Sequence, residues 1–410
     1  MFLLLLGFML LGIGVGVLTG LVPGVHPNTV FVISLSFSLT LMGGGVELLS
    51  ILVFIVSLAV SNTFTDFLPS ILLGAPEPDS ALSVLPGHKY LMEGRGYEAL
   101  FLTTLGGFGV ILLTILTLPF LILFIPLLYN FIYNSIHIIL LIIVVWMFST
   151  EFGIGKFYAL LTFLIVGLFG IITLNSFPSS FSLFPAFTGL FAFSTLVVSF
   201  YSKTTIPPQQ DIVDMKGYGI KGIVTGWLAG MLAGLLPGIG AAQAGVIAAQ
   251  TFKAKIKDFL IALGGINTAN IIFTLIVFYT IGKTRSGAVW TISQLTDTLV
   301  FTDMLVLVVA AATTCFISVI ITLKLGKFFV RRIRLIAYDK ITISIISVLL
   351  ILIFVMTGPI GLLIAATGTC IGLFAISTGI KRTHLMGFLI LPTILYFSGA
   401  SYLLSGLLGV

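Results

Sequence analysis

The chain has 410 residues, of which 59% are hydrophobic and only 8% are charged. Soluble domains carry roughly a quarter charged residues, so this chain cannot cover a water-facing surface with polar groups. The composition excludes soluble enzymes, nucleic-acid-binding proteins, disordered chains and secreted disulfide scaffolds, and it favours a polytopic membrane protein. The net charge of +6 then reflects the cytoplasmic excess of Lys and Arg on membrane proteins, and no nucleic-acid partner is expected.

Continuous apolar runs, such as 136–148, 158–174 and 341–356, predict helices rather than strands. A transmembrane barrel would show segments of about ten residues that alternate apolar and polar positions. Only helices satisfy their own backbone groups in lipid over such runs, so the predicted fold class is an all-α polytopic membrane protein. Cys315 and Cys370 lie inside apolar runs, where we expect helix packing rather than a disulfide or a metal site.

An internal repeat divides the chain. Residues 16–25 read GVLTGLVPGV and residues 230–239 read GMLAGLLPGI, so glycines and a Pro-Gly pair recur at matching positions. A second pair, Asn62-Thr63 and Asn267-Thr268, follows downstream in the same order. The sequence therefore predicts two related halves, 1–205 and 215–410.

Each half begins with an interrupted apolar segment. In the first half, the run 2–41 is broken at 22–28 by two prolines and a glycine, which end a helix. The runs that follow it are 46–73, 99–118, 130–148, 157–173 and 183–202. The second half has an interrupted run, 218–252, followed by 258–282, 299–323, 341–356, 359–378 and 384–410.

Loop charges predict the orientation. The loop 324–340 contains six Lys and Arg residues and is therefore expected in the cytoplasm of a cell-membrane protein. If each interrupted segment is a re-entrant hairpin, 17 of the 19 Lys and Arg residues fall on the inside, and both termini lie outside. Each half then holds one hairpin and five crossings. Because five is odd, the halves are inverted, an arrangement typical of secondary transporters, with about ten crossings and two opposed hairpins.

The hairpin tips are the candidate substrate site. A Pro-Gly break leaves unpaired amides at the start of the returning helix, and these amides and the helix dipole favour an anion. Gly16, Gly20, Gly230 and Gly234 instead suit tight helix packing. His26 would bind the anion, carry a proton or serve structure. The candidate substrate-binding residues are Pro23, Gly24, His26, Asn28, Thr29, Pro237, Gly238, Gly240, Gln243 and, in an outside loop, Arg285.

Polar side chains within two apolar runs form a second candidate site. Such residues are costly in a membrane and usually face the protein interior. They would supply oxygen ligands for a coupling cation, with Asp66 providing the charge, or they would form hydrogen bonds between helices. The candidate cation-coupling residues are Asn62, Thr63, Asp66, Asn267, Thr268 and Asn270. No metal site and no cofactor beyond a coupling Na⁺ or H⁺ is expected.

The repeated motifs carry a family resemblance. The stretches GVLTGLVPGVHPNT at 16–29, LLGAPEPDSALSVLPGHKYLMEGRGYEAL at 72–100 and GMLAGLLPGIGAAQAG at 230–245 resemble the large membrane subunit of tripartite tricarboxylate transporters, the TctA family, and its stand-alone archaeal members. The resemblance implies a secondary carrier for carboxylates, driven by a cation or proton gradient and served by a binding protein and a small membrane subunit.

The tip at 23–29 also resembles that of polyprenyl-phosphate translocases, which return a lipid carrier across the membrane. Opposed anion-binding tips would suit a phosphate head as well as a carboxylate. The sequence contains no HExxH, GxSxG or P-loop motif, so an enzyme is not expected. Membrane lipids and an anionic small molecule or lipid phosphate are the expected partners. A homodimer and accessory subunits are left open.

Overall fold

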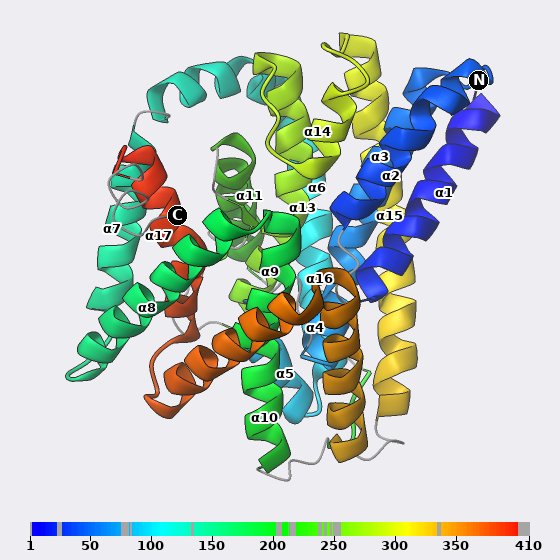
Figure 1. The fold of residues 1–410 in the computed structure, drawn as a ribbon. Helices are drawn as coiled ribbons and strands as arrows, with labels where there is room; N and C mark the ends of the chain where they lie inside the picture. The colour runs from blue at the N-terminus through cyan, green and yellow to red at the C-terminus, as the bar shows by residue number, and fades with distance from the viewer. Residues whose placement is uncertain are drawn as a thin grey trace.

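A computed structural model shows the arrangement of the chain (Figure 1). It describes residues 2–22, 27–74, 82, 84–132, 135–201, 207–211, 213, 219–236, 240–241, 244–246, 248, 256–333 and 338–400. Every regular element within these residues is a helix, as the continuous apolar runs predict.

The helices follow the predicted runs in order. Those of the first half are α1 (Phe2–Leu21), α2 (Pro27–Gly43), α3 (Leu48–Thr65), α4 (Phe67–Leu72), α5 (Val84–Met92), α6 (Gly96–Ile132), α7 (Ile136–Ser149), α8 (Gly155–Ser176), α9 (Ser179–Phe187), the π-helix Thr188–Phe193 and α10 (Ser194–Tyr201). Those of the second half are α11 (Ile220–Leu235), α13 (Ile256–Ile281), α14 (Gly287–Ser293), α15 (Phe301–Ile333), α16 (Tyr338–Ser377), the 3₁₀-helix Arg382–Met386 and α17 (Gly387–Phe397).

Among the described residues, seven helical segments are long and apolar enough to cross a membrane, and four shorter apolar helices accompany them. The protein is therefore a multi-pass helical membrane protein. The predicted number of ten crossings stays a prediction, because the shorter helices qualify by composition but not by length.

One boundary differs from the prediction, and a second, at Gly358, agrees with it. The expected linker 119–129 is helical, since α6 continues through Pro119 and Pro126. Apolar residues surround these prolines, and a membrane helix tolerates proline where its surroundings satisfy the freed backbone groups. The runs 341–356 and 359–378 form the two arms of α16, which meet at Gly358 in a left-handed conformation with φ 66°. Figure 1 shows the sharp angle between these arms.

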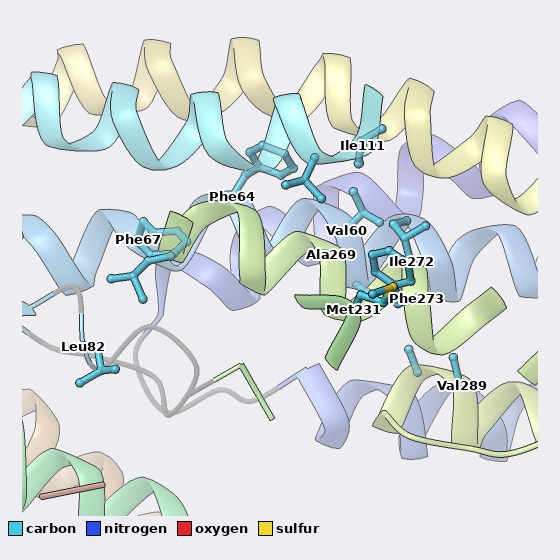
Figure 2. Close-up of a cluster of buried hydrophobic side chains, with 14 of the residues drawn as sticks. Val60, Phe64, Phe67, Leu82, Ile111, Met231, Ala269, Ile272, Phe273 and Val289 are labelled. Carbon is cyan, nitrogen blue, oxygen red and sulfur yellow. The ribbon is translucent and has the colours of Figure 1, made fainter. Parts of the chain in front are cut away.

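Helices α3 and α13 form the centre of the molecule. The crossing segments that contain them are 83% and 89% buried, against 28% for α1, so neighbouring helices rather than lipid surround them. α1 and α15 pack along α3, while α11 and α6 pack along α13. Figure 2 shows the resulting core, where Val60 and Phe64 of α3 lie near Ile272 and Phe273 of α13.

Glycines allow these helices to approach closely, as predicted for Gly16, Gly20, Gly230 and Gly234. A Cβ at Gly16 would overlap Ser61 and the Leu58 carbonyl oxygen of α3, and one at Gly20 would overlap Thr65. In α11, a Cβ at Gly234 would lie 2.6 Å from Phe273 Cβ of α13, and Gly230 faces Ala269 in the same way. The repeated glycines therefore allow close packing of α1 on α3 and of α11 on α13.

Gly16→Ala is expected to lower the free energy of unfolding by about 2 kcal/mol, because the added methyl group meets the backbone of α3. Gly14→Ala is the matched control in the same helix, since a Cβ there meets nothing within 4 Å. Thermal unfolding in detergent measures both variants. Equal stability of the two variants would contradict the close contact.

Candidate functional site

The predicted hairpin tips fall largely outside the described residues. This applies to Pro23, Gly24, His26, Pro237, Gly238 and Gln243. Asn28 and Thr29 lie in the first turn of α2, where only the backbone is described, and Gly240 follows the end of α11. α1 ends at Leu21 and α2 begins at Pro27, so a helix break occurs where the prolines predict it. The role of the tips in substrate binding stays a prediction.

The two Asn-Thr motifs meet in the centre of the protein. The hydroxyl oxygens of Thr63 on α3 and Thr268 on α13 lie 3.1 Å apart. Asn267, which directly precedes Thr268, donates a hydrogen bond from Nδ2 to Oδ2 of Asp66 at 2.8 Å. Asp66 lies about one turn after Thr63. All four residues are at least 95% buried. Residues about 200 positions apart in sequence thus form one polar contact at the centre of the protein, between α3 and α13.

The contact between the two threonines lies where the symmetry axis of the predicted repeat would run. Thr63 and Thr268 occupy equivalent positions of the two Asn-Thr motifs. When two equivalent atoms of a two-fold arrangement touch each other, the axis must pass between them. The 3.1 Å contact between these hydroxyls therefore marks where a pseudo-two-fold axis between the halves would run.

The surroundings of the contact are asymmetric. Asn267 bonds to Asp66, whereas its equivalent, Asn62, donates to Thr19 Oγ1 of α1 at 3.1 Å. The alignment of the two Asn-Thr motifs places Ile271 at the position equivalent to Asp66, and the alignment of the two glycine motifs places Ala233 at the position equivalent to Thr19. The second half therefore lacks both partners, and the site carries one carboxylate rather than two.

The other two candidates lie apart from this contact. Asn270 is on α13, and within the described structure its buried Oδ1 accepts no hydrogen bond. Arg285 precedes α14 and donates from Nη2 to the Tyr129 hydroxyl at 2.9 Å, with its guanidinium 5.5 Å from that ring. The described part of the chain therefore connects Arg285 to the end of α6 and not to the substrate-binding candidates.

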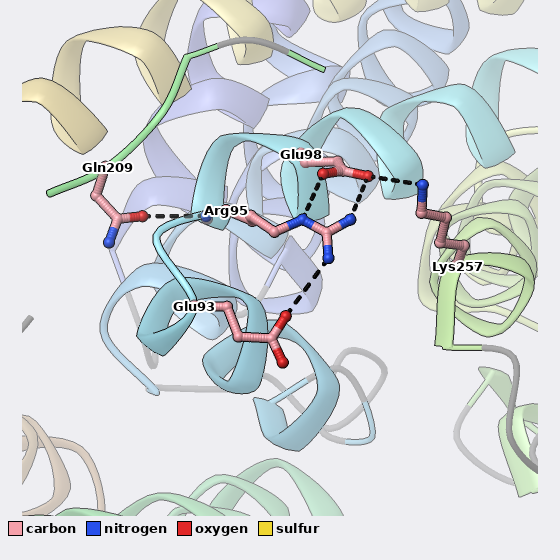
Figure 3. Close-up of polar contacts among 6 residues, drawn as sticks. Glu93, Arg95, Glu98, Gln209 and Lys257 are labelled. Carbon is pink, nitrogen blue, oxygen red and sulfur yellow. Dashed lines mark hydrogen bonds and ion pairs between the residues drawn. The ribbon is translucent and has the colours of Figure 1, made fainter. Parts of the chain in front are cut away.

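An ion-pair network at the start of α6 was not predicted from the sequence (Figure 3). Arg95 binds Glu98 through Nε at 2.8 Å and Nη2 at 2.9 Å, and Lys257 Nζ lies 3.2 Å from Glu98 Oε1. Gln209 Oε1 accepts a hydrogen bond from the Gly96 amide at 3.0 Å. The i,i+3 spacing of Arg95 and Glu98 is a local signal, but Lys257 and Gln209 are too distant in sequence to be inferred.

The segment between the halves also binds α15. Asp211 pairs with Arg331 and with Lys327, whose Nζ lies 3.1 Å from the carboxylate. Hydrogen bonds from these two side chains hold the pKa of Asp211 below its usual value. Together with the Glu98 network, this contact gathers Arg95, Lys257, Lys327 and Arg331 at one end of the molecule. Their cytoplasmic position stays a prediction.

A multi-pass helical protein with an ionisable residue buried among its central helices has a polar interior of the kind that marks functional sites in membrane proteins. The chain belongs to the tripartite tricarboxylate transporter TctA family, whose sequence profile matches residues 6–387. It is 29% identical over 402 residues to an uncharacterized protein of Methanocaldococcus jannaschii, covering 95% of this chain and 98% of that protein. No solved structure matches the chain. The family is one of transporter components.

Proposed function

We propose that the protein is a secondary transporter that moves a small organic anion of the carboxylate class by alternating access, coupled to Na⁺ or H⁺. The observation that carries this proposal is the buried contact of Thr63, Thr268, Asp66 and Asn267 between the halves of a TctA-family chain. A buried ionisable residue within membrane helices is by default a functional site.

Reciprocal packing supports an inverted repeat with halves 1–205 and 215–410. α6 of the first half packs on α13 of the second, and α15 of the second packs on α3 of the first. Likewise, α9 and α10 pack on α16, while α17 packs on α8. Such mutual exchange of equivalent helices is expected when two halves of one fold face each other in opposite orientations.

The coupling ion would bind beside Asp66. Carboxylate, hydroxyl and amide oxygens from Asp66, Thr63, Thr268 and Asn267 suit a hard cation such as Na⁺, whereas protonation of Asp66 would serve H⁺. Because Ile271 occupies the position equivalent to Asp66, this site would carry one negative charge and bind one monovalent cation.

The anion would bind at the helix breaks after α1 and α11. The first turn of α2 begins at Pro27, and unpaired amides at such a helix start attract a carboxylate. His26, Asn28, Thr29 and Gln243 would add polar groups. The basic end of the molecule, with Lys257, Lys327 and Arg331, would face the cytoplasm of a cell membrane, and both termini would lie outside.

The contact between α6 and α13 would stay intact during the alternating movement. Glu98 is paired with Lys257 near the start of both helices, and Tyr129 near the end of α6 is bonded to Arg285 beyond the end of α13. Close glycine contacts join the helices between these points. α6 and α13 would therefore move as one body, although they belong to different halves.

The family match favours a carboxylate over the lipid-phosphate alternative, to which no observation on the described residues gives support. The test is ligand-induced thermal stabilisation of the purified full-length protein. Di- and tricarboxylates are compared with short-chain polyprenyl phosphates, each with and without Na⁺, because a ligand that binds only the folded state raises apparent stability. Stabilisation by a carboxylate is expected. Stabilisation by the lipid phosphate alone would overturn the proposal.

A further inference from the structure

The segment 381–384, directly before α17, belongs to the second half but makes its polar contacts with the first. The Lys381 amide donates to Glu151 Oε1 at 3.2 Å, and Lys381 Nζ donates to the Thr150 carbonyl at 3.1 Å. His384 Nε2 lies 3.0 Å from the same Glu151 oxygen. These contacts attach the segment to the turn between α7 and α8.

Arg382 anchors the same segment on its other side. Its side chain reaches the π-helix and the start of α10, where backbone carbonyls lack their usual i→i+4 partners. The guanidinium donates to four oxygens: Thr195 Oγ1 and Ser194 Oγ, both at 2.5 Å, and the carbonyls of Leu190 at 2.8 Å and Phe191 at 3.0 Å. With Arg382 fixed in this way, His384 is held against Glu151.

His384 itself is fully buried, with 0% exposure. Its ring stacks on Phe148, with the ring centroids 5.5 Å apart and the planes 7° from parallel. Its second ring nitrogen, Nδ1, is buried without a hydrogen-bond partner among the described residues. The Glu151 side chain is 11% exposed, so water can reach the pair through the carboxylate.

Few other charges act on the pair. α8, α16 and α17 pack against this segment, and within the described chain Glu151 and Lys381 are the charged groups that influence His384. Arg382 points away, to the π-helix. The protonation state of His384 therefore depends mainly on the carboxylate of Glu151, the ammonium of Lys381 and the lack of an acceptor at Nδ1.

We propose that Glu151 and His384 form a proton-binding site, separate from Asp66, whose occupancy weakens the contact between the halves. In the unprotonated form, the neutral imidazole donates its Nε2–H to the Glu151 carboxylate and leaves Nδ1 without a proton. A second proton on the imidazole would bind at Nδ1 and create a buried N–H that has no acceptor among the described residues. A buried unsatisfied donor is unfavourable, so the protonated segment is released from its place.

The test is the pH dependence of the apparent melting temperature of the full-length protein. In the unfolded chain, histidine takes up a proton near pH 6.5, whereas in the folded protein a proton at His384 Nδ1 would find no acceptor among the described residues. The unfolded state thus binds more protons, and stability falls as the pH drops. Between pH 7.5 and 5.5, His384→Gln should remove a drop on the order of 2 °C that the wild type shows. His137→Gln, on α7, should behave as the wild type.

A second variant keeps the test decisive if His384→Gln does not fold. Glu151→Gln preserves an acceptor for Nε2–H but removes the charge that favours the imidazolium, so its drop on acidification should be larger than that of the wild type. A melting temperature that rises on acidification would instead indicate a resting imidazolium–carboxylate ion pair and would overturn the proposal. Identical profiles for wild type and His384→Gln would exclude a proton site.

Discussion

Asp66→Asn is expected to abolish cation-driven uptake while leaving the protein folded. Asparagine has nearly the same shape and keeps an oxygen that accepts the hydrogen bond from Asn267 Nδ2, which is 2.8 Å long in the wild type. Only the negative charge is lost, and the equivalent position of the other half, Ile271, cannot replace it. A cation would therefore lose its one charged ligand at the contact between the halves.

The measurement is uptake into proteoliposomes of the carboxylate that stabilises the protein, under an imposed Na⁺ or pH gradient. Uptake by the variant should fall to the level of empty vesicles. Asp303→Asn, in the first turn of α15 and only partly buried, is the control and should transport normally. Undiminished uptake by Asp66→Asn would assign Asp66 to helix packing alone.

Gly106→Ala is expected to lower the free energy of unfolding by about 3 kcal/mol, at the upper end of the usual cost of overpacking. A Cβ at Gly106 of α6 would overlap the Ile261 carbonyl oxygen of α13 and lie 2.9 Å from the Gly265 nitrogen. These are backbone atoms of a buried helix, which cannot move aside as a flexible side chain does.

The opposing helix makes the reciprocal approach. A Cβ at Gly264 of α13 would overlap the Thr103 carbonyl oxygen and lie 2.6 Å from its carbon, so neither helix can shift to relieve a clash on the other. The gain in helix propensity from Gly to Ala, about 1 kcal/mol, is too small to offset this cost.

Chemical or thermal unfolding in detergent measures the effect. Gly7→Ala is the control, because a Cβ at this position of α1 meets nothing within 4 Å, and it should leave stability unchanged or slightly increased. A stable Gly106→Ala variant would show that α6 and α13 can separate, and it would remove the support for their moving as one body.

Both predictions concern the centre of the molecule, where the polar contact and the glycine contacts lie on the same helices. α13 places Thr268 against Thr63 of α3, and one turn earlier it places Gly264 against Thr103 of α6. A change in the occupancy of the Asp66 site would therefore act directly on the helix that joins the halves. This closeness would give the proposed cation site a direct physical connection to the packed pair of α6 and α13.

The sequence by itself determined the features that depend on neighbouring residues. Continuous apolar runs specify membrane helices because lipid leaves backbone groups no other partner. Proline ends helices locally, so the break between Leu21 and Pro27 could be read directly. Repeated glycines at fixed spacing indicated close packing, and the two Asn-Thr motifs indicated equivalent polar positions in two halves.

Tertiary structure alone decided which of these residues meet. Thr63 and Thr268 are 205 positions apart, and nothing in either helix specifies that their hydroxyls face each other. The same holds for Glu98 with Lys257 and for Arg285 with Tyr129. The prediction of a linker at 119–129 was wrong, since α6 continues as a helix through Pro119 and Pro126. Periodicity and turn residues specify where helices lie along the chain, whereas pairing between them depends on how whole helices pack together.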